Sequence, residues 1–264
     1  MPLDEIKGIK RRYARKNLSY LRTVIKKNIP NVFTLCNLLC GCIAIVFAFE
    51  GNLVWSACLV GVSCVFDFLD GMVARLLKAY SELGKQLDSL ADMVSFGVLP
   101  GVIVFKLINH SMVTCGADIF VAAPVSFFGF LVTIFSAIRL AKFNIDTRQT
   151  DSFIGVPTPA NTILIASLPL IHQFNSSYDS LILNQCFLIG LTLVMSFLLV
   201  APLPLFALKF KNFSWRDNKV RFIFLTLSLL MLIVFQFVGI PLIIILYIVL
   251  SVINNILTGS KIQS

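Results

Sequence analysis

The chain has 264 residues, of which 58% are hydrophobic and 13% are charged, and its formal net charge is +9. Soluble domains have roughly 45–50% apolar and about 25% charged residues, so this composition excludes a water-soluble domain, a disordered chain and a small secreted disulfide protein. In a soluble protein the positive charge would suggest nucleic-acid binding, but the apolar excess indicates a membrane protein, for which we expect no nucleic-acid partner. Because the apolar runs are continuous rather than alternating, they favour transmembrane helices over a β-barrel.

Residues 1–28 form a basic leader that we expect to be a cytoplasmic helix lying on the membrane surface. Nine of the 22 Lys and Arg residues fall in this segment. The apolar residues interleaved with them are Ile6, Ile9, Tyr13, Tyr20, Leu21 and Val24. This pattern is typical of an interfacial amphipathic helix on anionic headgroups, although a solvated basic tail has the same composition. We expect residues 29–264 to form one transmembrane domain.

Eight stretches are apolar and long enough, or nearly so, to cross a bilayer, which requires about 20 residues. They lie at about 31–50, 53–75, 87–108, 118–141, 158–174, 183–204, 219–236 and 239–257. The predicted fold class is therefore all-α, a polytopic membrane protein with about eight transmembrane helices preceded by the interfacial helix. With this count, 21 of the 22 Lys and Arg residues fall on the side of the leader, and only Lys106 falls near the other side. Since Lys and Arg gather on the cytoplasmic side of membrane proteins, we expect both termini to lie in the cytoplasm. We expect the protein to lie in the cytoplasmic membrane of a bacterium or an archaeon.

Four aspartates lie inside the second and third predicted spans, where charge is costly. They are Asp67, Asp70, Asp88 and Asp92, and each ionised Asp at mid-bilayer costs roughly 2.5–3.5 kcal/mol. Each pair lies on one face of its helix, and a connection of about ten residues predicts antiparallel neighbours whose carboxylate faces meet. Carboxylates suit Mg²⁺ or Mn²⁺, and two such ions would form a clamp for phosphoryl chemistry. The alternative is a cation or proton transporter that uses the acidic cluster.

The acidic residues belong to a longer pattern with small residues at fixed intervals. It reads Asp67-x2-Asp70-Gly71-x2-Ala74-Arg75-x8-Gly84-x3-Asp88-x3-Asp92. All eight positions and every gap resemble the signature of the CDP-alcohol phosphatidyltransferase family. The resemblance implies that an alcohol attacks the lipid-linked phosphorus of a CDP-activated lipid, CDP-diacylglycerol, and that CMP is released.

The resemblance also implies a role for each position of the pattern. The four aspartates would hold two Mg²⁺ or Mn²⁺ ions, with Ca²⁺ as a non-productive occupant, and Asp92 would also be the general base for the acceptor hydroxyl. The nucleotide and the lipid diphosphate would lie against Asp67, Gly71, Ala74, Arg75 and Gly84. Arg75 would either face the diphosphate or brace the carboxylates.

A polar pattern opens the first predicted span. Pro30-Asn31-x2-Thr34-x2-Asn37-x3-Gly41 resembles the corresponding segment of the same family. The resemblance makes Asn31 and Thr34, one helical turn apart at the cytoplasmic mouth, candidates for nucleotide binding. Helix N-capping is the alternative explanation for Asn and Thr at this place.

Two later segments concern the acceptor alcohol. They read Arg139-Leu-Ala-Lys142-Phe-Asn144 and Phe153-Ile-Gly-Val-Pro157-Thr-Pro159-Ala-Asn161, and they resemble the membrane-embedded (type II) phosphatidylserine synthases. The resemblance implies L-serine as the acceptor, an active site on the cytoplasmic side, contact with membrane lipids and a homodimer.

Serine carries a carboxylate, which Arg binds in a bidentate geometry. We therefore expect a serine site formed by Arg139, Lys142, Asn144 and Arg148. Glycerol 3-phosphate or inositol phosphate would also require cations there, so charge alone leaves the acceptor open. Basic residues on a cytoplasmic loop also set topology without binding a substrate.

Overall fold

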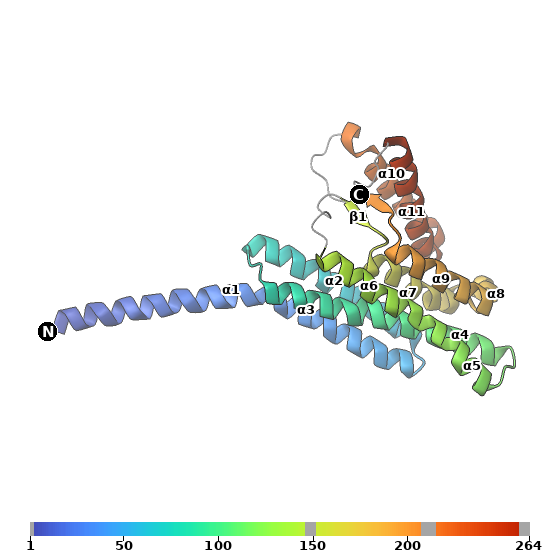
Figure 1. Ribbon diagram of the computed structural model, residues 1–264, viewed down its shortest axis with the longest axis horizontal. Helices are drawn as coiled ribbons and strands as arrows, with labels where there is room; N and C mark the ends of the chain where they lie inside the picture. The colour runs from blue at the N-terminus through green and yellow to red at the C-terminus, as the bar shows by residue number, and fades with distance from the viewer. Residues whose placement is uncertain (1–2, 146–151, 207–214, 259–264) are drawn as a thin grey trace.

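The computed structural model describes residues 3–145, 152–206 and 215–258, and this part of the chain is almost entirely helical (Figure 1). Two long helices, α1 (Leu3–Phe49) and α2 (Leu53–Leu77), form a hairpin. The turn between them contains Gly51, whose φ of 85° is a left-handed conformation that glycine adopts without steric cost. Asn52 then caps α2, because its side chain accepts a hydrogen bond from the backbone N–H of Trp55.

A second helical path runs through the middle of the bundle. It consists of α3 (Glu82–Asp92), the π-helical segment η1 (Met93–Val98) and α4 (Leu99–Thr114). The side chains of α4 form the centre of the apolar core, where Leu99, Ile103 and Leu107 are almost completely buried. The π-helical segment begins directly after Asp92, and π-helical turns are frequent at functional sites.

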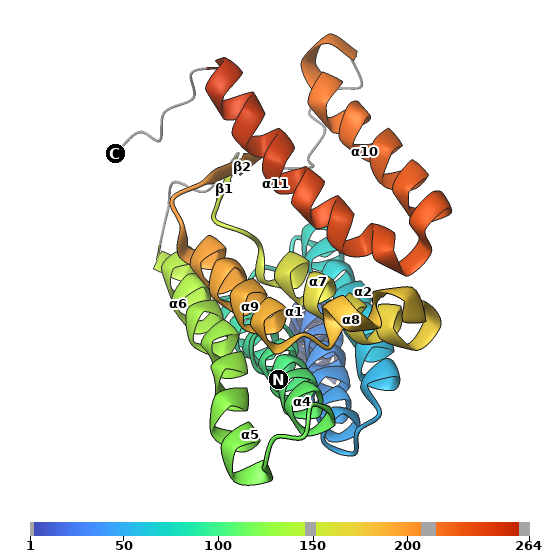
Figure 2. The same ribbon diagram turned by 90° about the vertical axis from the view of Figure 1, so that its right-hand side faces the viewer.

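The remaining helices enclose this path. They are α5 (Ile119–Ser126), η2 (Phe127–Phe130), α6 (Leu131–Ile145), α7 (Thr158–Phe174), η3 (Ser176–Tyr178), α8 (Asp179–Ile182), α9 (Gln185–Val200), α10 (Trp215–Phe235), η4 (Gln236–Val238) and α11 (Gly239–Thr258). α4 packs against α5, α7 and α9, whereas α10 and α11 form a splayed hairpin at one side of the bundle (Figure 2). α11 joins this hairpin to the bundle by packing on α7.

A small strand pair adds to the predicted all-α fold. β1 (Ser152–Ile154) and β2 (Pro204–Phe206) pair in antiparallel register, with Phe153 opposite Leu205. The pair fastens the segment before α7 to the segment after α9. It is also tied to α11, where the Tyr247 hydroxyl donates a hydrogen bond to the backbone carbonyl of Phe206 over 2.9 Å.

Within the described residues, five helical stretches are long and apolar enough to cross a membrane, or six if two pieces bent by 71° form one span. They are Lys26–Phe49, Leu53–Leu77, Glu82–Thr114, Phe120–Ile145 and Asn218–Leu257, with Ser176–Ile182 and Gln185–Val200 as the bent pair. The chain is therefore an all-α polytopic membrane protein. The predicted number of eight spans stays a prediction, since α7 has 17 residues and the last stretch contains both α10 and α11, which diverge in Figure 2.

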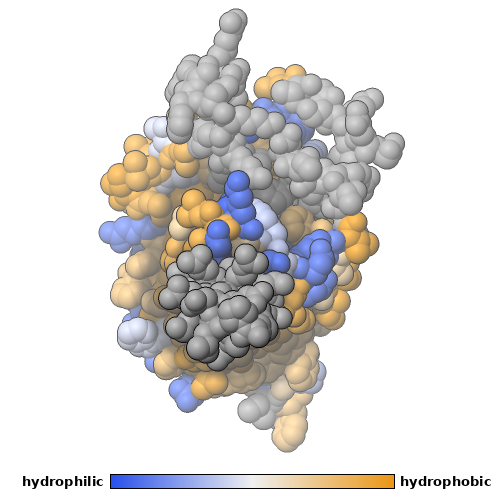
Figure 3. Space-filling model, turned by 90° about the vertical axis from the view of Figure 1, so that its left-hand side faces the viewer, coloured by the Kyte–Doolittle hydropathy of each residue, from blue (hydrophilic) through white to orange (hydrophobic). Residues whose placement is uncertain are grey.

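The basic leader continues into the first apolar stretch without a break. α1 runs from Leu3 to Phe49, so the boundary predicted at residue 28 is not a helix end. The N-terminal part of α1 projects from the bundle in Figure 1. Figure 3 views the molecule from that end, where hydrophilic side chains gather on one part of the face and hydrophobic side chains cover the flanks. Contact of the leader with a lipid surface stays a prediction.

Candidate functional site

The four aspartates of the pattern lie on two helices that meet beside α1. Asp67 and Asp70 belong to α2, whereas Asp88 and Asp92 belong to α3. One carboxylate oxygen from each of Asp67, Asp70 and Asp88 lies within 4.8 Å of the other two. The Asp92 carboxyl group is not one of these three, but it lies close enough to interact electrostatically with each of them. The structure thus brings the two carboxylate faces together, as the spacing predicts.

The connection between α2 and α3 is shorter than predicted. Only residues 78–81 join the helices, rather than about ten, so α3 begins before the predicted start of the third span. Lys78 ends α2 in a left-handed conformation (φ 50°), with its N–H directed at the carbonyls of Ala74 and Arg75. Ser81 then starts α3 by accepting a hydrogen bond from the backbone N–H of Gly84 over 3.0 Å.

Polar side chains of α1 donate hydrogen bonds to the acids. The Thr34 hydroxyl donates to Asp70 Oδ2 over 2.7 Å, and Asn37 Nδ2 donates to Asp92 Oδ1 over 3.3 Å. The backbone carbonyl of Asn37 accepts from the Ser95 hydroxyl of η1 over 3.0 Å. Asn37 is therefore a site residue to which the sequence analysis assigns no role. Its signal in the sequence is an amide in an apolar run, one turn after Thr34.

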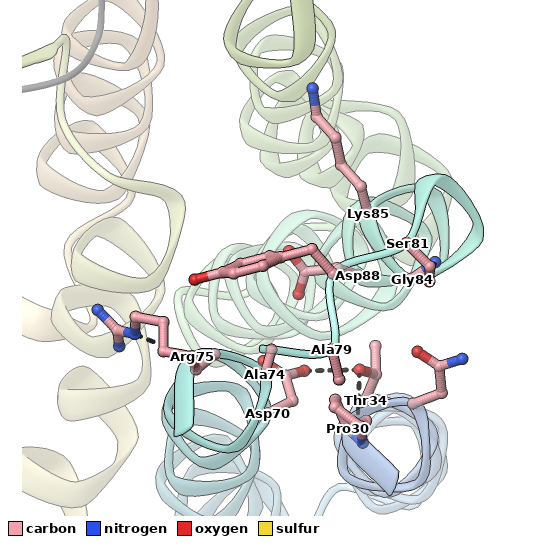
Figure 4. Close-up of a pocket in the computed structure, with 13 residues that line it drawn as sticks. Pro30, Thr34, Asp70, Ala74, Arg75, Ala79, Ser81, Gly84, Lys85 and Asp88 are labelled. Carbon is pink, nitrogen blue, oxygen red and sulfur yellow. Dashed lines mark hydrogen bonds between the residues drawn. The ribbon is translucent and has the colours of Figure 1, made fainter. Parts of the chain in front are cut away.

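A cavity of about 300 Å³ lies between α1, α2 and α3 beside the acids (Figure 4). Its walls include all the predicted nucleotide residues except Asp67, namely Asn31, Thr34, Gly71, Ala74, Arg75 and Gly84. Asp70 and Asp88 also line it, which connects the cavity directly to the carboxylate group. Tyr80 and Lys85 are wall residues that the sequence analysis does not single out.

The glycines of the site serve two different purposes. A Cβ atom on Gly41 would overlap the Ser95 hydroxyl and lie 3.0 Å from Ser95 Cα, so Gly41 permits α1 to approach η1. A Cβ atom on Gly84 would lie 3.0 Å from the side-chain oxygen of Asn31. The absence of this atom allows α3 to lie close to α1. In contrast, a Cβ atom on Gly71 would meet nothing nearer than 3.9 Å. Gly71 therefore keeps part of the cavity open.

Two cations stand at the cavity, and neither neutralises the acids. Arg75 is exposed, its Nε donates to the Gly71 carbonyl over 2.9 Å, and in Figure 4 its side chain points away from Asp70. Lys85 Nζ donates to the backbone carbonyl of Asn144 over 3.1 Å. Over the described parts of the chain, no Lys or Arg nitrogen forms an ion pair with any of the four aspartates. Arg75 therefore does not brace the carboxylates in this structure.

The carboxylate group has the chemistry of a divalent-cation site. Asp88 Oδ1 is buried and has no hydrogen-bond partner among the residues that the structure describes. Buried polar atoms are nearly always partnered, and several carboxylates at one place repel one another unless they share protons or a cation. Hard oxygen donors are the ligands that Mg²⁺, Mn²⁺ and Ca²⁺ prefer. The donor set therefore fits a divalent cation.

Of the residues predicted to bind serine, Arg139 lies deepest in the protein. Its side chain is only 7% exposed and interacts electrostatically with Asp92. Arg139 Nη1 donates to the Thr158 hydroxyl over 3.4 Å, and the guanidinium group lies 5.9 Å from the ring centre of Phe143. Arg139 thus joins α6 and α7 beside the acidic cluster.

The other predicted serine residues are placed differently. Lys142 is exposed. The Asn144 amide exchanges hydrogen bonds with the Ser89 hydroxyl, at 2.8 Å as donor and 3.1 Å as acceptor, and so fastens α6 to α3. Arg148 lies outside the described residues. Among the three described residues of this set, Arg139 is the one that interacts electrostatically with an acid of the cluster, Asp92.

Comparison with known proteins agrees with the pattern. A family model described as CDP-alcohol phosphatidyltransferase matches residues 27–198, which include the acids, the cavity walls and Arg139. The chain is 35% identical over 171 residues to a Helicobacter pylori protein named CDP-diacylglycerol–serine O-phosphatidyltransferase, covering 62% of this chain and 68% of the relative. Proteins of the same name from Bacillus subtilis (36% over 131 residues; 50% and 69% covered) and Methanocaldococcus jannaschii (31% over 168 residues; 63% and 70% covered) are also similar.

Proposed function

Because the chain belongs to the CDP-alcohol phosphatidyltransferase family, we propose that it transfers the phosphatidyl group of CDP-diacylglycerol to the hydroxyl group of L-serine, giving phosphatidylserine and CMP. The observation that carries this proposal is the meeting of Asp67, Asp70 and Asp88 beside a cavity lined by the rest of the family pattern. The names of the similar proteins supply the two substrates.

The four aspartates would hold a pair of divalent cations, Mg²⁺ or Mn²⁺. When bound, such cations polarise the lipid diphosphate and neutralise the charge that develops on the departing CMP. The hydrogen bond from Thr34 orients the Asp70 carboxylate, as partners of metal ligands commonly do. Ca²⁺ accepts similar oxygen ligands in a larger and less regular geometry, so it occupies the site without supporting turnover.

Asp92 acts as the general base. The new bond joins the serine hydroxyl oxygen to the phosphorus that carries diacylglycerol. The bond that breaks joins this phosphorus to the bridging oxygen, which leaves with CMP and the electron pair. Asp92 accepts the hydroxyl proton, and we propose direct displacement without a covalent enzyme intermediate. Since Asn37 holds one oxygen of Asp92, the second oxygen is left for this proton.

The cavity takes the cytidine nucleotide and its diphosphate. Its volume of about 300 Å³ is at the lower end of the range for small-molecule sites. Gly71 and Ala74 provide the space, Asn31 supplies a polar contact, and Arg75 and Lys85 place positive charge near the diphosphate. Gly84 allows α3 to lie close to α1 and form one wall of the cavity. Thr34 and Asp67 connect the nucleotide cavity to the proposed cation site.

The acceptor approaches from the side of Arg139. A serine carboxylate bound to this guanidinium group would lie on the side of the acidic cluster, because Arg139 is buried within electrostatic range of Asp92. That position presents the serine hydroxyl to the base. Lys142, Asn144 and Arg148 complete the serine site at the end of α6 and in the segment that follows it.

The acceptor is identified by offering purified full-length protein CDP-diacylglycerol with labelled L-serine, glycerol 3-phosphate or inositol phosphate. We expect equal amounts of CMP and phosphatidylserine with serine and no lipid product with the other two. Release of CMP with incorporation of another alcohol would remove serine from the proposal and keep the enzyme class. Cation flux in liposomes without CMP production would instead identify a transporter.

We also propose the finer organisation of the protein. Residues 1–28 form a basic leader at the membrane surface, and residues 29–264 form one domain of about eight spans, with both termini and the active site on the cytoplasmic side of the cytoplasmic membrane. Protease accessibility of the leader in inside-out vesicles, compared with right-side-out vesicles, tests this orientation. The mass of the detergent-solubilised protein, corrected for bound detergent, tests the homodimer that the family resemblance implies.

A further inference from the structure

Asn161 of α7 is a buried residue whose side-chain amide lacks hydrogen-bond partners at both ends among the described residues. It is 0% exposed, and neither its amide oxygen nor its amide nitrogen has a hydrogen-bond partner in the part of the chain that the structure describes. An Asn side chain offers two donors and an acceptor with two lone pairs, and buried polar groups are nearly always partnered. Both ends of this amide therefore lack a partner within the described protein.

The neighbouring buried residues on the same helix do not share this feature. The Thr162 hydroxyl bonds to the backbone carbonyl of Phe96, and the Ser167 hydroxyl bonds to the carbonyl of Leu164. α7 thus satisfies its other buried polar side chains within the protein. Among the buried polar side chains of α7, only that of Asn161 has no hydrogen-bond partner within the described chain.

Asn161 belongs to the same helix as Thr158, the residue that contacts Arg139. Thr158 stands one turn earlier on the same face, as residues three apart in a helix do, and its hydroxyl accepts a hydrogen bond from Arg139 Nη1 over 3.4 Å. Arg139 Nε has no partner among the described residues, and neither does the hydroxyl of buried Ser136, one turn earlier on α6. We call Ser136, Arg139, Thr158 and Asn161 the acceptor cluster. Its charged member, Arg139, interacts electrostatically with Asp92.

The acceptor cluster combines the donors and acceptors that an α-amino acid requires. A carboxylate only accepts hydrogen bonds, and Arg139 only donates. An ammonium group only donates, so it requires an acceptor such as a neutral amide or hydroxyl oxygen. A further carboxylate in this role would add negative charge beside the four aspartates, whereas the Asn161 amide adds none.

We propose that Asn161 binds the amino-acid end of the acceptor, its amide oxygen accepting from the ammonium group and its amide nitrogen donating to the carboxylate that Arg139 binds. This inference rests on the proposed function and names a specificity residue for it. Alcohols that carry a phosphate and no ammonium group leave the Asn161 oxygen unpartnered. Asn161 therefore selects serine over such alcohols.

The test compares wild-type protein with Asn161→Ala and Asn161→Leu, in detergent with Mn²⁺, by separate KM values for L-serine and CDP-diacylglycerol. Losing hydrogen bonds to charged groups should raise the KM for serine at least about tenfold, while the KM for CDP-diacylglycerol stays within about twofold. Ser167→Ala, a buried polar change on the same helix, is the matched control and should leave both values unchanged. A serine KM unchanged in both Asn161 variants would overturn the inference.

A second measurement separates binding from folding. L-alanine has both charged groups of serine but no hydroxyl, so it competes with serine without reacting, and its inhibition constant should rise in parallel with the serine KM. Neither constant depends on the fraction of folded enzyme, so partial unfolding does not imitate the effect. Serine incorporation by the wild type reports on the proposed function itself, and the ratio between variant and wild type reports on Asn161.

Discussion

Asn37 Nδ2 donates a hydrogen bond to Asp92 Oδ1 over 3.3 Å and so links α1 to the last residue of α3. The Asn37 side chain is completely buried, and its backbone carbonyl is held by the Ser95 hydroxyl of the π-helical segment. The orientation of the Asp92 carboxylate is therefore set by three elements. Asn37 fixes one carboxylate oxygen of Asp92, and in the proposed mechanism the other oxygen accepts the proton of the substrate hydroxyl.

Asp92→Asn should abolish most turnover and spare nucleotide binding. The substituted amide keeps the size of the side chain and an oxygen for Asn37, but it cannot accept a proton at the acceptor hydroxyl. We expect kcat to fall by about 10²–10⁴-fold, measured as CMP release, with CDP binding unchanged. Glu82→Gln, an exposed change on the same helix, is the control and should retain activity. Normal turnover by Asp92→Asn would refute the general-base assignment.

Asn37→Leu should slow catalysis without removing the base. The apolar side chain has a similar size, and the variant loses only the donor that orients Asp92. A hydrogen bond to a charged group contributes about 1.5–3 kcal/mol, so kcat should fall by about tenfold or more while the KM for CDP-diacylglycerol changes little. An unchanged kcat would show that other contacts position Asp92.

Thr34→Val should weaken metal activation. The substitution keeps the shape of the side chain and removes the hydroxyl that donates to Asp70 over 2.7 Å. Partners of metal ligands typically change metal affinity or activity by about 10–100-fold, so the Mn²⁺ concentration for half-maximal activity should rise by about tenfold. Thr34→Ser retains the hydroxyl and should behave as the wild type. Equal Mn²⁺ curves for Val and Thr at this position would exclude a role for the bond.

Gly71→Ala and Gly41→Ala should fail in different ways. The methyl group at position 71 enters the cavity without meeting other atoms closely, so the melting temperature should hold while the KM for CDP-diacylglycerol rises by about tenfold. The methyl group at position 41 would overlap Ser95. Overpacking of this kind costs about 1–3 kcal/mol, so Gly41→Ala should lower the melting temperature. Identical behaviour of the two variants would contradict the cavity assignment.

Ca²⁺ should bind without supporting turnover. Its coordination is larger and less regular than that of Mg²⁺ or Mn²⁺, so it would not hold the diphosphate in the geometry that transfer requires. Titration of Ca²⁺ into the Mn²⁺-dependent reaction should give inhibition that rising Mn²⁺ relieves. Full activity with Ca²⁺ alone would show that the site accepts either geometry.

The arrangement of the acids is predictable from the sequence because it depends on local rules. Helical periodicity places Asp67 with Asp70 and Asp88 with Asp92, and a short connection makes the two helices neighbours. The same periodicity places Gly71, Ala74 and Gly84 at the cavity. The connection between α2 and α3 is shorter than the predicted ten residues, because Lys78 ends one helix and Ser81 starts the other within four residues.

Other parts of the site depend on packing between distant segments, which no local pattern reports. Three features depend on helices that are far apart in the sequence. They are the hydrogen bond from Asn37 to Asp92, the hydrogen bond from Lys85 to the Asn144 carbonyl and the burial of Arg139. The π-helical turn after Asp92 and the pairing of β1 with β2 leave no periodic signal, because each involves only a few residues.

Mn²⁺ binding tests the cation site most directly. Purified protein with CDP-diacylglycerol is titrated with Mn²⁺, and the free ion is measured by electron paramagnetic resonance, for the wild type and for Asp88→Asn. We predict saturable binding by the wild type and an affinity at least about tenfold weaker in the variant, which loses a ligand oxygen. A wild type that binds no Mn²⁺, or a variant that binds it as tightly as the wild type, would contradict the assignment of the aspartates to a divalent cation.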